Sequence, residues 1–497
     1  MTTSEAPAKP KLTIDGQAVE FQPGDTIMKA AERARMDGTI PRFCYHPGLP
    51  VAGTCRMCTV EVEKAPKLMT ACSTPAADGM VVLTQSDRVR KSRSGVMEFL
   101  LANHPLDCPV CDQAGECSLQ DYNYEYGPSK SHFVEDKRVW KEATTKRLSD
   151  KLTLNMNRCI HCERCVRFTE DVTKTHELLM DNRAWRKELT TALDEGLFND
   201  YQGNVADICP VGAITFNDFR FHKRVWFLKE KTGICDGCAK GCSIYADEEK
   251  DTVYRYRARF NKDVNDHWIC DEGRVSFHTY QQADRIVQPL LTAGSTLNAT
   301  SWETLVPWFT NELKKARRVL ILIGTDASSE EAATIAQVLP SFSSADFVVR
   351  SWNGTGDGVR TSADDAPLDH LLRRRDQTSN TRGIEGLGIK PWNEAQDQNF
   401  DLAIYFRSGR ATLPPSMAAK EIAWGVFSLA EAQRFAAVLP GLSTLEKFGT
   451  YTNCDQITQS FETVVKGLGG SASVRKILDG MKLKSNTPVR EVAGDTI

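Results

Sequence analysis

The sequence predicts a multidomain protein that is α+β in its first half and α/β in its second half. The chain of 497 residues is too long for a single hydrophobic core. Fifteen of its 16 cysteines lie in tight groups between Cys44 and Cys270, and only Cys454 stands apart. After about residue 285, apolar runs of strand length alternate with helical patterns. We therefore expect a cysteine-dense half and an almost cysteine-free half.

Composition limits the classes of partner and the role of the cysteines. The chain has 62 basic and 65 acidic residues and a net charge of −3, which argues against nucleic acid as a partner. The polar start "MTTSEAPAKPKL" does not resemble a secretory signal, and no apolar run approaches the roughly 20 residues that span a bilayer. We therefore expect membrane association only through partner subunits. Without export, disulfides are not expected, and metal ligation explains the cysteines better.

The first cysteine set follows a strand–turn–strand–helix pattern. "LTIDGQAVEF" predicts two strands around an Asp15-Gly16 turn, and "GDTIMKAAERARM" predicts a helix capped by Asp25 or Thr26. An inner C-x2-C pair and a remote fourth cysteine are typical of plant-type 2Fe–2S ferredoxins, although the first gap is longer here. A zinc ribbon is the alternative, but it usually has two such pairs. Residues 10–95 are predicted to form a β-grasp 2Fe–2S domain with the ligands Cys44, Cys55, Cys58 and Cys72.

The second set contains one histidine. "HPLDCPVCDQAGEC" has the spacing H-x3-C-x2-C-x5-C and supplies His104, Cys108, Cys111 and Cys117 within a segment expected at residues 96–135. One imidazole and three thiolates suit tetrahedral zinc, and they also suit an iron–sulfur cluster with one unusual ligand. This stretch alone does not decide between the two.

The third set has the 4Fe–4S spacing C-x2-C-x2-C with a distant C-P. Its ligands would be Cys159, Cys162, Cys165 and Cys209, in a ferredoxin-like domain at residues 140–225. Thr169 stands where a two-cluster ferredoxin has the fourth cysteine of the run, so one cluster is expected. We expect His161 to point away from the iron, because four cysteines already complete the site.

The fourth set is spaced C-x2-C-x3-C-x27-C, and strand-like alternation fills its long gap. It predicts a small β-rich 4Fe–4S module at residues 228–285, with structural zinc as the alternative; its ligands would be Cys235, Cys238, Cys242 and Cys270. Beside three such sites, the second set is most simply a further cluster. No nucleophile–base pair stands out, so the pattern indicates an electron carrier and not a catalyst.

The order of these four motifs resembles the large iron–sulfur subunit (the G-type subunit) of NADH:quinone oxidoreductase, respiratory complex I. The resemblance covers residues 10–285 and implies one 2Fe–2S and three 4Fe–4S clusters on the four sets, the fourth lying off the main electron path. It implies that electrons enter from flavin/NADH-binding and 2Fe–2S subunits, and pass through the first, third and second sets. They would then leave to further 4Fe–4S and quinone-site subunits. It also implies a peripheral position on the cytoplasmic side of the membrane.

The second half, residues 286–497, resembles a shortened and degenerate molybdopterin-oxidoreductase domain, because "FAAVLPGLSTLEKFGTYTNCDQITQSF" has that family's strand-Pro and Glu-Lys-x-Gly-Thr pattern. We expect a doubly wound α/β domain without molybdopterin and without chemistry of its own. "VLILIG", "DLAIYF" and "FAAVLP" would form its sheet, with "EEAATIAQVL" on one face. Ser351–Asn399 is expected to be an insertion or mobile surface, "LLRRRD" a solvated face, and Cys454 a dispensable thiol far from every ligand set.

Other classes of protein remain open at this point. The chain could be the electron-transfer subunit of an NAD-linked hydrogenase or of a formate dehydrogenase. A catalytic molybdenum enzyme would need a metal ligand soon after the fourth set, and no cysteine lies between Cys270 and Cys454. An iron-only hydrogenase would need further cysteines for its active-site cluster. A zinc-stabilised scaffold is the least specific alternative.

Overall fold

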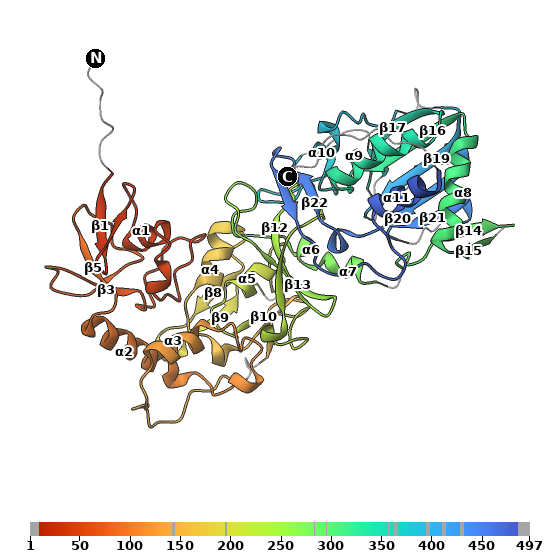
Figure 1. Cartoon of the computed structure of the whole chain (residues 1–497). Helices are drawn as coiled ribbons and strands as arrows, with labels where there is room; N and C mark the ends of the chain where they lie inside the picture. Colours follow the sequence, from red (N-terminus) through yellow and green to blue (C-terminus); the bar gives the residue numbers. More distant parts are fainter. Residues whose placement is uncertain are drawn as a thin grey trace, which may run out of the picture. The chain divides into compact units, whose positions relative to one another are not determined.

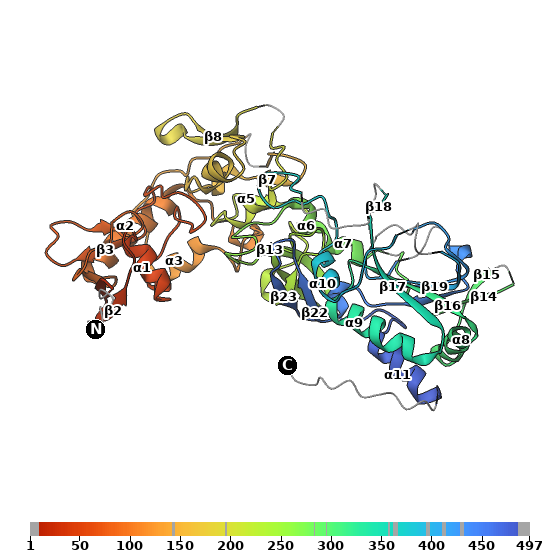
Figure 2. The same cartoon turned by 90° about the horizontal axis from the view of Figure 1, so that it is seen from above.

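The computed structural model describes residues 9–141, 145–193, 196–282, 284–294, 296–355, 358–360, 366–393, 398–409, 414–427 and 432–485. The chain divides into two compact units, unit 1 (Met1–Phe227) and unit 2 (Leu228–Ile497). Figures 1 and 2 show the elements of both units. The expected fourth module, residues 228–285, therefore belongs to the same unit as the α/β half. No described helix combines the length and apolar character needed to cross a bilayer.

Unit 1 begins with a five-stranded mixed sheet in the order β2-β1-β5-β3-β4. The predicted hairpin forms as expected, because Asp15 and Gly16 both take the positive φ angles that its two-residue turn requires. Thr26 caps the predicted helix by accepting a hydrogen bond from the Lys29 amide. The elements are β1 (Lys11–Ile14), β2 (Gln17–Glu20), α1 (Ile27–Arg33), β3 (Thr59–Val62), β4 (Met69–Thr70) and β5 (Val81–Leu83).

Two helices frame the second cysteine set. Ser86 caps α2 (Asp87–Asn103), which ends directly at His104, and α3 (Ser118–Tyr126) begins directly after Cys117. The rest of unit 1 is made of short elements. They are β6 (Lys146–Arg147), β7 (Leu152–Leu154), α4 (Arg164–Arg167), the π-helical turn Phe168–Val172, β8 (Leu178–Asp181), β9 (Glu188–Thr191), α5 (Gly203–Asp207) and β10 (Ile214–Phe216).

Unit 2 begins with a three-stranded antiparallel sheet of β11 (Lys229–Ile234), β12 (Ser243–Glu249) and β13 (Thr252–Ala258). The alternating pattern between Cys242 and Cys270 therefore predicted strands correctly. The turn at Lys250 and Asp251 again uses two positive φ angles. Two short helices follow, α6 (Asp271–Val275) and α7 (Phe277–Tyr280).

An eight-stranded sheet forms the centre of the second half, in the order β15-β14-β21-β20-β19-β16-β17-β18. Its inner strands from β21 to β17 are parallel, and its outer strands pair antiparallel. The three predicted runs are strands of this sheet. The strands are β14 (Leu290–Ala293), β15 (Thr296–Ala299), β16 (Arg318–Gly324), β17 (Asp346–Thr355), β18 (Gly358–Arg360), β19 (Phe400–Arg407), β20 (Ala418–Gly425) and β21 (Ala437–Pro440).

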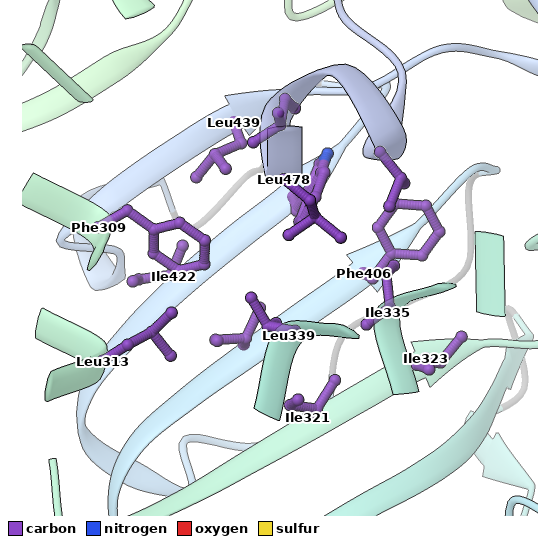
Figure 3. Packing of buried hydrophobic residues seen from close by; sticks show 14 of the residues in the cluster. Phe309, Leu313, Ile321, Ile323, Ile335, Leu339, Phe406, Ile422, Leu439 and Leu478 are labelled. Atoms are coloured by element: carbon purple, nitrogen blue, oxygen red, sulfur yellow. The ribbon is translucent and has the colours of Figure 1, made fainter. Parts of the chain in front are cut away.

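The longer helices gather on one face of this sheet. Figure 3 shows Phe309 and Leu313 of α8 (Trp302–Lys315), Ile335 of α9 (Ser329–Val338) and Leu478 of α11 (Val474–Ser485) packed over buried strand residues. Ile286, Trp392 and Phe435, which lie outside the α-helices, belong to the cluster on the other face. The described part of the domain therefore lacks the helical cover on both faces that a doubly wound fold implies.

The expectation of an insertion or mobile surface at Ser351–Asn399 does not fit several described residues of this range, which are buried within the domain. β17 continues to Thr355, and α10 (Thr381–Gly386) follows a stretch of buried polar residues. The fully buried Asp376 carboxylate accepts hydrogen bonds from Asn353, Thr378 and Thr381. Residues 356–357, 361–365 and 394–397 lie outside the described residues.

A final hairpin of β22 (Gly449–Thr452) and β23 (Thr458–Phe461) contains Cys454 in its turn.

Candidate metal centres

The four cysteines of the first set come together on loops beside the N-terminal sheet. Hydrogen bonds from the thiols of Cys55 and Cys72 lower the pKa of Cys44, while the bonds of Cys72 with Cys44 and Cys58 raise the pKa of Cys72. The Cys44 amide also lies 3.4 Å from the Cys55 sulfur. Cys44, Cys58 and Cys72 are buried, and Cys55 is half-buried. The structure thus gathers four sulfur atoms at one place, as the spacing predicted.

The second set lines a cavity of about 420 Å³ between α2, α3 and the segment around Lys137. Its lining includes all four predicted ligands, His104, Cys108, Cys111 and Cys117. Cys117 is buried, and burial raises the pKa of its thiol. Cys108 is exposed, so this site reaches the surface of unit 1.

His104 has a buried ring nitrogen that is available to bind a metal atom. This nitrogen, Nδ1, neither donates nor accepts a hydrogen bond within the described residues. Burial, together with the charges of Lys137 and Arg158, lowers the pKa of the imidazole to about 4, so the ring is neutral at pH 7. A neutral imidazole with an unsatisfied buried nitrogen is costly unless something binds it, and a metal atom would do so.

The third set lines a second cavity, in which Cys159, Cys162, Cys165 and Cys209 are joined by apolar residues such as Leu189 and Ile214. Burial raises the pKa of Cys159 to about 12 and that of Cys162 to about 11. Buried thiols of this kind ionise when a metal compensates the charge of the thiolate. The backbone N–H of His161 donates to the Cys159 sulfur at 3.4 Å, which is a contact that iron–sulfur sites use to tune their potential.

His161 and Thr169 are both engaged elsewhere. A ring nitrogen of His161 lies 2.9 Å from the carbonyl oxygen of Lys187, which agrees with the expectation that this side chain is not a ligand. The Thr169 hydroxyl donates to the Val166 carbonyl at 3.0 Å and accepts from the Leu178 amide. Thr169 therefore stabilises the π-helical turn through its hydroxyl hydrogen bonds, at the position where a two-cluster ferredoxin would have a cysteine.

The fourth set lines a third cavity, in unit 2, formed by Cys235, Cys238, Cys242 and Cys270. Cys270 caps α6, and its sulfur accepts from the Gly273 amide at 3.3 Å. Burial raises the pKa of the Cys270 thiol to about 12 and those of Cys235 and Cys242 well above the ordinary value. A Cβ at Gly273 would lie 2.8 Å from the Cys235 sulfur, so only glycine fits between Cys235 and Cys270.

The first and third sets are joined by two arginines of α4. One Arg167 nitrogen donates to the carbonyl oxygens of Cys44 at 2.5 Å and Cys162 at 3.3 Å. Arg164 donates to the carbonyls of Tyr45, next to Cys44, and of Ile208, next to Cys209. Each guanidinium therefore bridges the backbone of the two sets.

The third and second sets also adjoin. Arg158, the neighbour of Cys159, forms an ion pair at 3.0 Å with Asp107, the neighbour of Cys108. Gly212, which follows Cys209 in the C-P loop, lies so close to Cys111 that an added Cβ would be 2.2 Å from its sulfur. Unit 1 therefore arranges its sets in the spatial order first, third, second.

Two sequence expectations near the fourth set are wrong. Cys454 is not far from every ligand set, because its amide donates to the carbonyl of Ala239 at 2.8 Å, next to Cys238. The run "LLRRRD" is not simply a solvated face, since Leu372, Arg373 and Arg374 line the fourth cavity. Only packing between distant segments produces these contacts, so local sequence patterns gave no signal for them.

The side chains of these sites are not arranged to bind a single metal ion. Within the described ranges, no three His, Cys, Asp or Glu side chains form a group suited to one ion. The ligands of a cluster bind different iron atoms and therefore surround a cavity. The donor chemistry of the sets, their buried thiols and the unpartnered His104 nitrogen fit iron–sulfur clusters.

Three protein-family models match unit 1. Residues 9–87 match a "2Fe-2S iron-sulfur cluster binding domain", and residues 93–132 match the "NADH-ubiquinone oxidoreductase-G iron-sulfur binding region". Residues 149–215 match "NADH-quinone oxidoreductase subunit 3, ferredoxin-like domain". These ranges contain the first, second and third sets, respectively, and the fourth set lies outside them.

Similar proteins extend the match along the chain. The G subunit of NADH-quinone oxidoreductase from Rickettsia bellii is 40% identical over 324 residues, which are 64% of this chain and 46% of that protein. The mitochondrial NADH-ubiquinone oxidoreductase 78 kDa subunit of Neurospora crassa is 42% identical over 305 residues, 61% of this chain and 40% of that protein. The chain thus spans about half the length of such relatives.

A solved NAD+-reducing [NiFe]-hydrogenase in the H2-reduced state is also similar, with 29% identity and a TM-score of 0.40, over 44% of this chain and 92% of that chain. The sequence matches are stronger. Through its cysteine-rich part, the chain is similar to the iron–sulfur subunits represented by the G subunit of NADH-quinone oxidoreductase and the mitochondrial 78 kDa subunit.

Proposed function

We propose that this chain is an electron-transfer subunit in the peripheral arm of an NADH:quinone oxidoreductase. One observation supports the proposal most strongly. The predicted ligand sets of unit 1 adjoin in the order first, third, second, and buried arginines or close backbone contacts link each neighbouring pair. This is the order in which the family resemblance implies that electrons travel.

Each set would hold one cluster. Cys44, Cys55, Cys58 and Cys72 would bind 2Fe–2S, and the other three sets would each bind 4Fe–4S. The clusters supply one-electron transfer when bound. The protein's part is to bury the sulfurs, donate backbone N–H groups to them and keep the sites in sequence.

The second half would have no cofactor of its own. In an open α/β sheet, ligands bind beyond the carboxyl ends of the parallel strands, at the point where the strand order reverses. Here that point lies between β16 and β19. Asp326, just after β16, already accepts hydrogen bonds from the amides of Ser408 and Gly409, just after β19. Lys447 donates to Ser408 and pairs with Glu331 beside them. These polar groups at the carboxyl edge of the sheet are therefore already paired with one another.

Catalysis would take place on other subunits. NADH and flavin chemistry would belong to partners upstream, and quinone chemistry to partners downstream. The chain would then lie on the cytoplasmic side of the membrane, held there by those partners. The proposed partners and location are inferred from the similar proteins. The chain spans about half the length of those proteins.

Four single substitutions, one in each set, test the proposal: Cys58→Ser, Cys111→Ser, Cys165→Ser and Cys242→Ser. In the full chain, each should remove one cluster signal from the electron paramagnetic resonance (EPR) spectrum of the reduced protein and leave the other three. Cys58→Ser should remove a 2Fe–2S signal, and the others 4Fe–4S signals. Four variants with the unchanged wild-type spectrum would refute the assignment of these sets.

A further inference from the structure

The cavity of the fourth set is closed by a segment more than 90 residues away in sequence. Leu368, Leu372, Arg373, Arg374 and Gln377 line it together with the four cysteines. We call residues Leu368–Gln377 the lid. Leu372 is buried and presents an apolar side chain, while the two arginines bring positive charge to the cysteines.

The lid is held firmly to the cysteine loop. The Ala239 amide, between Cys238 and Cys242, donates to the carbonyl of Asp376 at 2.8 Å. The lid also folds back on itself, since Leu368 donates to the Arg373 carbonyl and Arg375 to the Ala366 carbonyl, each at 3.0 Å. With the Asp376 carboxylate anchored to Asn353, the lid has a fixed position over the cavity.

Arg374 makes the most direct contact with the predicted ligands. Its backbone N–H hydrogen-bonds to the Cys238 sulfur, and its positive charge acts on both Cys238 and Cys242. Its side chain hydrogen-bonds to the Cys454 thiol. These contacts explain why Cys454 lies beside this set without lining its cavity.

The other cations near the cavity are balanced by carboxylates. Arg373 lies 3.6 Å from Glu272, and Lys240 lies 2.6 Å from Asp455. Arg374 has no such ion pair within the described residues; its guanidinium donates to the Arg373 carbonyl at 3.0 Å. Among the described residues around the cavity, the charge of Arg374 is therefore the least compensated one.

We propose that the lid excludes water from the fourth cluster and that Arg374 is a positioning residue that raises the reduction potential of this cluster. Reduction adds a negative charge. A nearby cation and an N–H···S hydrogen bond both stabilise the reduced form, so both raise the potential. The inference rests on the proposed function, because it requires a 4Fe–4S cluster on this set.

The test is an EPR-monitored redox titration of the full chain. The signal of the fourth cluster is identified as the one that Cys235→Ser removes. Arg374→Gln should move its midpoint potential to a more negative value, and Arg374→Lys should move it less. Arg375→Gln is the matched control, because Arg375 is the exposed neighbour outside the cavity lining, and it should leave the potential unchanged.

A second variant protects the test against misfolding. Gln377→Glu would place a carboxylate beside Arg374, whose carbonyl the Gln377 amide now contacts at 3.0 Å, and it should also lower the potential. If Arg374→Gln retains the cluster at the wild-type potential, the inference is wrong. If that variant loses the cluster, an unchanged potential in Gln377→Glu overturns the inference. Absence of a fourth cluster from the wild-type chain would instead refute the proposed function of this set.

Discussion

Cys44 and Cys162 belong to different ligand sets, yet their carbonyl oxygens accept hydrogen bonds from the same nitrogen of Arg167. Arg167 is buried, and its other terminal nitrogen donates to the Pro50 carbonyl. Arg167, like Arg164, therefore helps to fix the separation of two predicted clusters. Electron transfer between clusters depends steeply on their separation, so this contact has a functional consequence.

Arg167→Gln should slow electron transfer from the first to the third cluster. It should also cost roughly 1.5–3 kcal/mol of unfolding free energy, because buried carbonyls lose a charged donor. Rapid-freeze EPR after reduction measures the transfer, and denaturant unfolding measures the stability. Arg88→Gln is the control, since Arg88 forms a partly exposed ion pair with Glu61 in the same unit. Equal transfer rates in Arg167→Gln and Arg88→Gln would contradict the predicted role.

His104→Cys should lower the reduction potential of the second cluster. Imidazole is neutral where a thiolate is negative, so the substitution adds one negative charge to the ligand set, and His-ligated clusters have higher potentials for this reason. A redox titration of the EPR signal measures the shift. An unchanged spectrum and potential would show that His104, despite its unpartnered Nδ1, is not a ligand.

Gly212→Ala should disturb the second cluster more than it disturbs the other three clusters. The added Cβ would approach the Cys111 sulfur to 2.2 Å, although Gly212 follows a cysteine of the third set. We expect loss or broadening of the signal that Cys111→Ser removes. Gly95→Ala is the matched control, because nothing lies within 4 Å of its Cβ in α2, and alanine there should stabilise the helix by about 0.5–1 kcal/mol. Identical cluster signals in both variants would argue against the close approach.

Cys454→Ser should leave the cluster content of the chain unchanged. Cys454 lies beside the fourth set, but it does not line the cavity and the set already has four cysteines. Iron analysis of the purified variant measures this directly. A loss of about four irons relative to the wild type would show that Cys454 is needed for one 4Fe–4S cluster.

Local spacing predicted which cysteines come together, because the residues that bind one cluster are mostly separated by short loops. The hairpin at Asp15-Gly16 and the strands β16, β19 and β21 were predictable for a similar reason, since their signals lie within a few residues. β20 was missed because its sequence includes Lys420 and Glu421, which are unusual in a buried strand. Glu421 is buried there only because it pairs with Arg434 and with the Tyr405 hydroxyl.

The links between sites could not be predicted from the sequence. Arg167 reaches Cys44 across more than 120 residues, and the lid reaches Ala239 from Asp376. Such contacts depend on how separate segments pack, and a charged run such as "LLRRRD" looks the same whether it faces solvent or a cluster. The burial of Asp376, in a segment expected to be an insertion or mobile surface, was unpredictable for the same reason, because it depends on the distant partner Asn353.

The isolated full chain should not oxidise NADH, because the proposed flavin and NADH sites lie on partner subunits. Ferricyanide reduction with NADH as donor measures this activity. The control is dithionite, which should reduce the clusters of the same preparation and so show that they are functional. NADH-dependent ferricyanide reduction by the purified chain alone would contradict the proposal.

Iron and acid-labile sulfide analysis of the full chain, with EPR of the reduced protein, tests the central claim most directly. One 2Fe–2S and three 4Fe–4S clusters predict about fourteen irons per chain, with an equal amount of sulfide. The spectrum should contain one binuclear and three tetranuclear signals. Stoichiometric zinc in place of iron, without labile sulfide, would contradict the account and make the chain a zinc-stabilised scaffold.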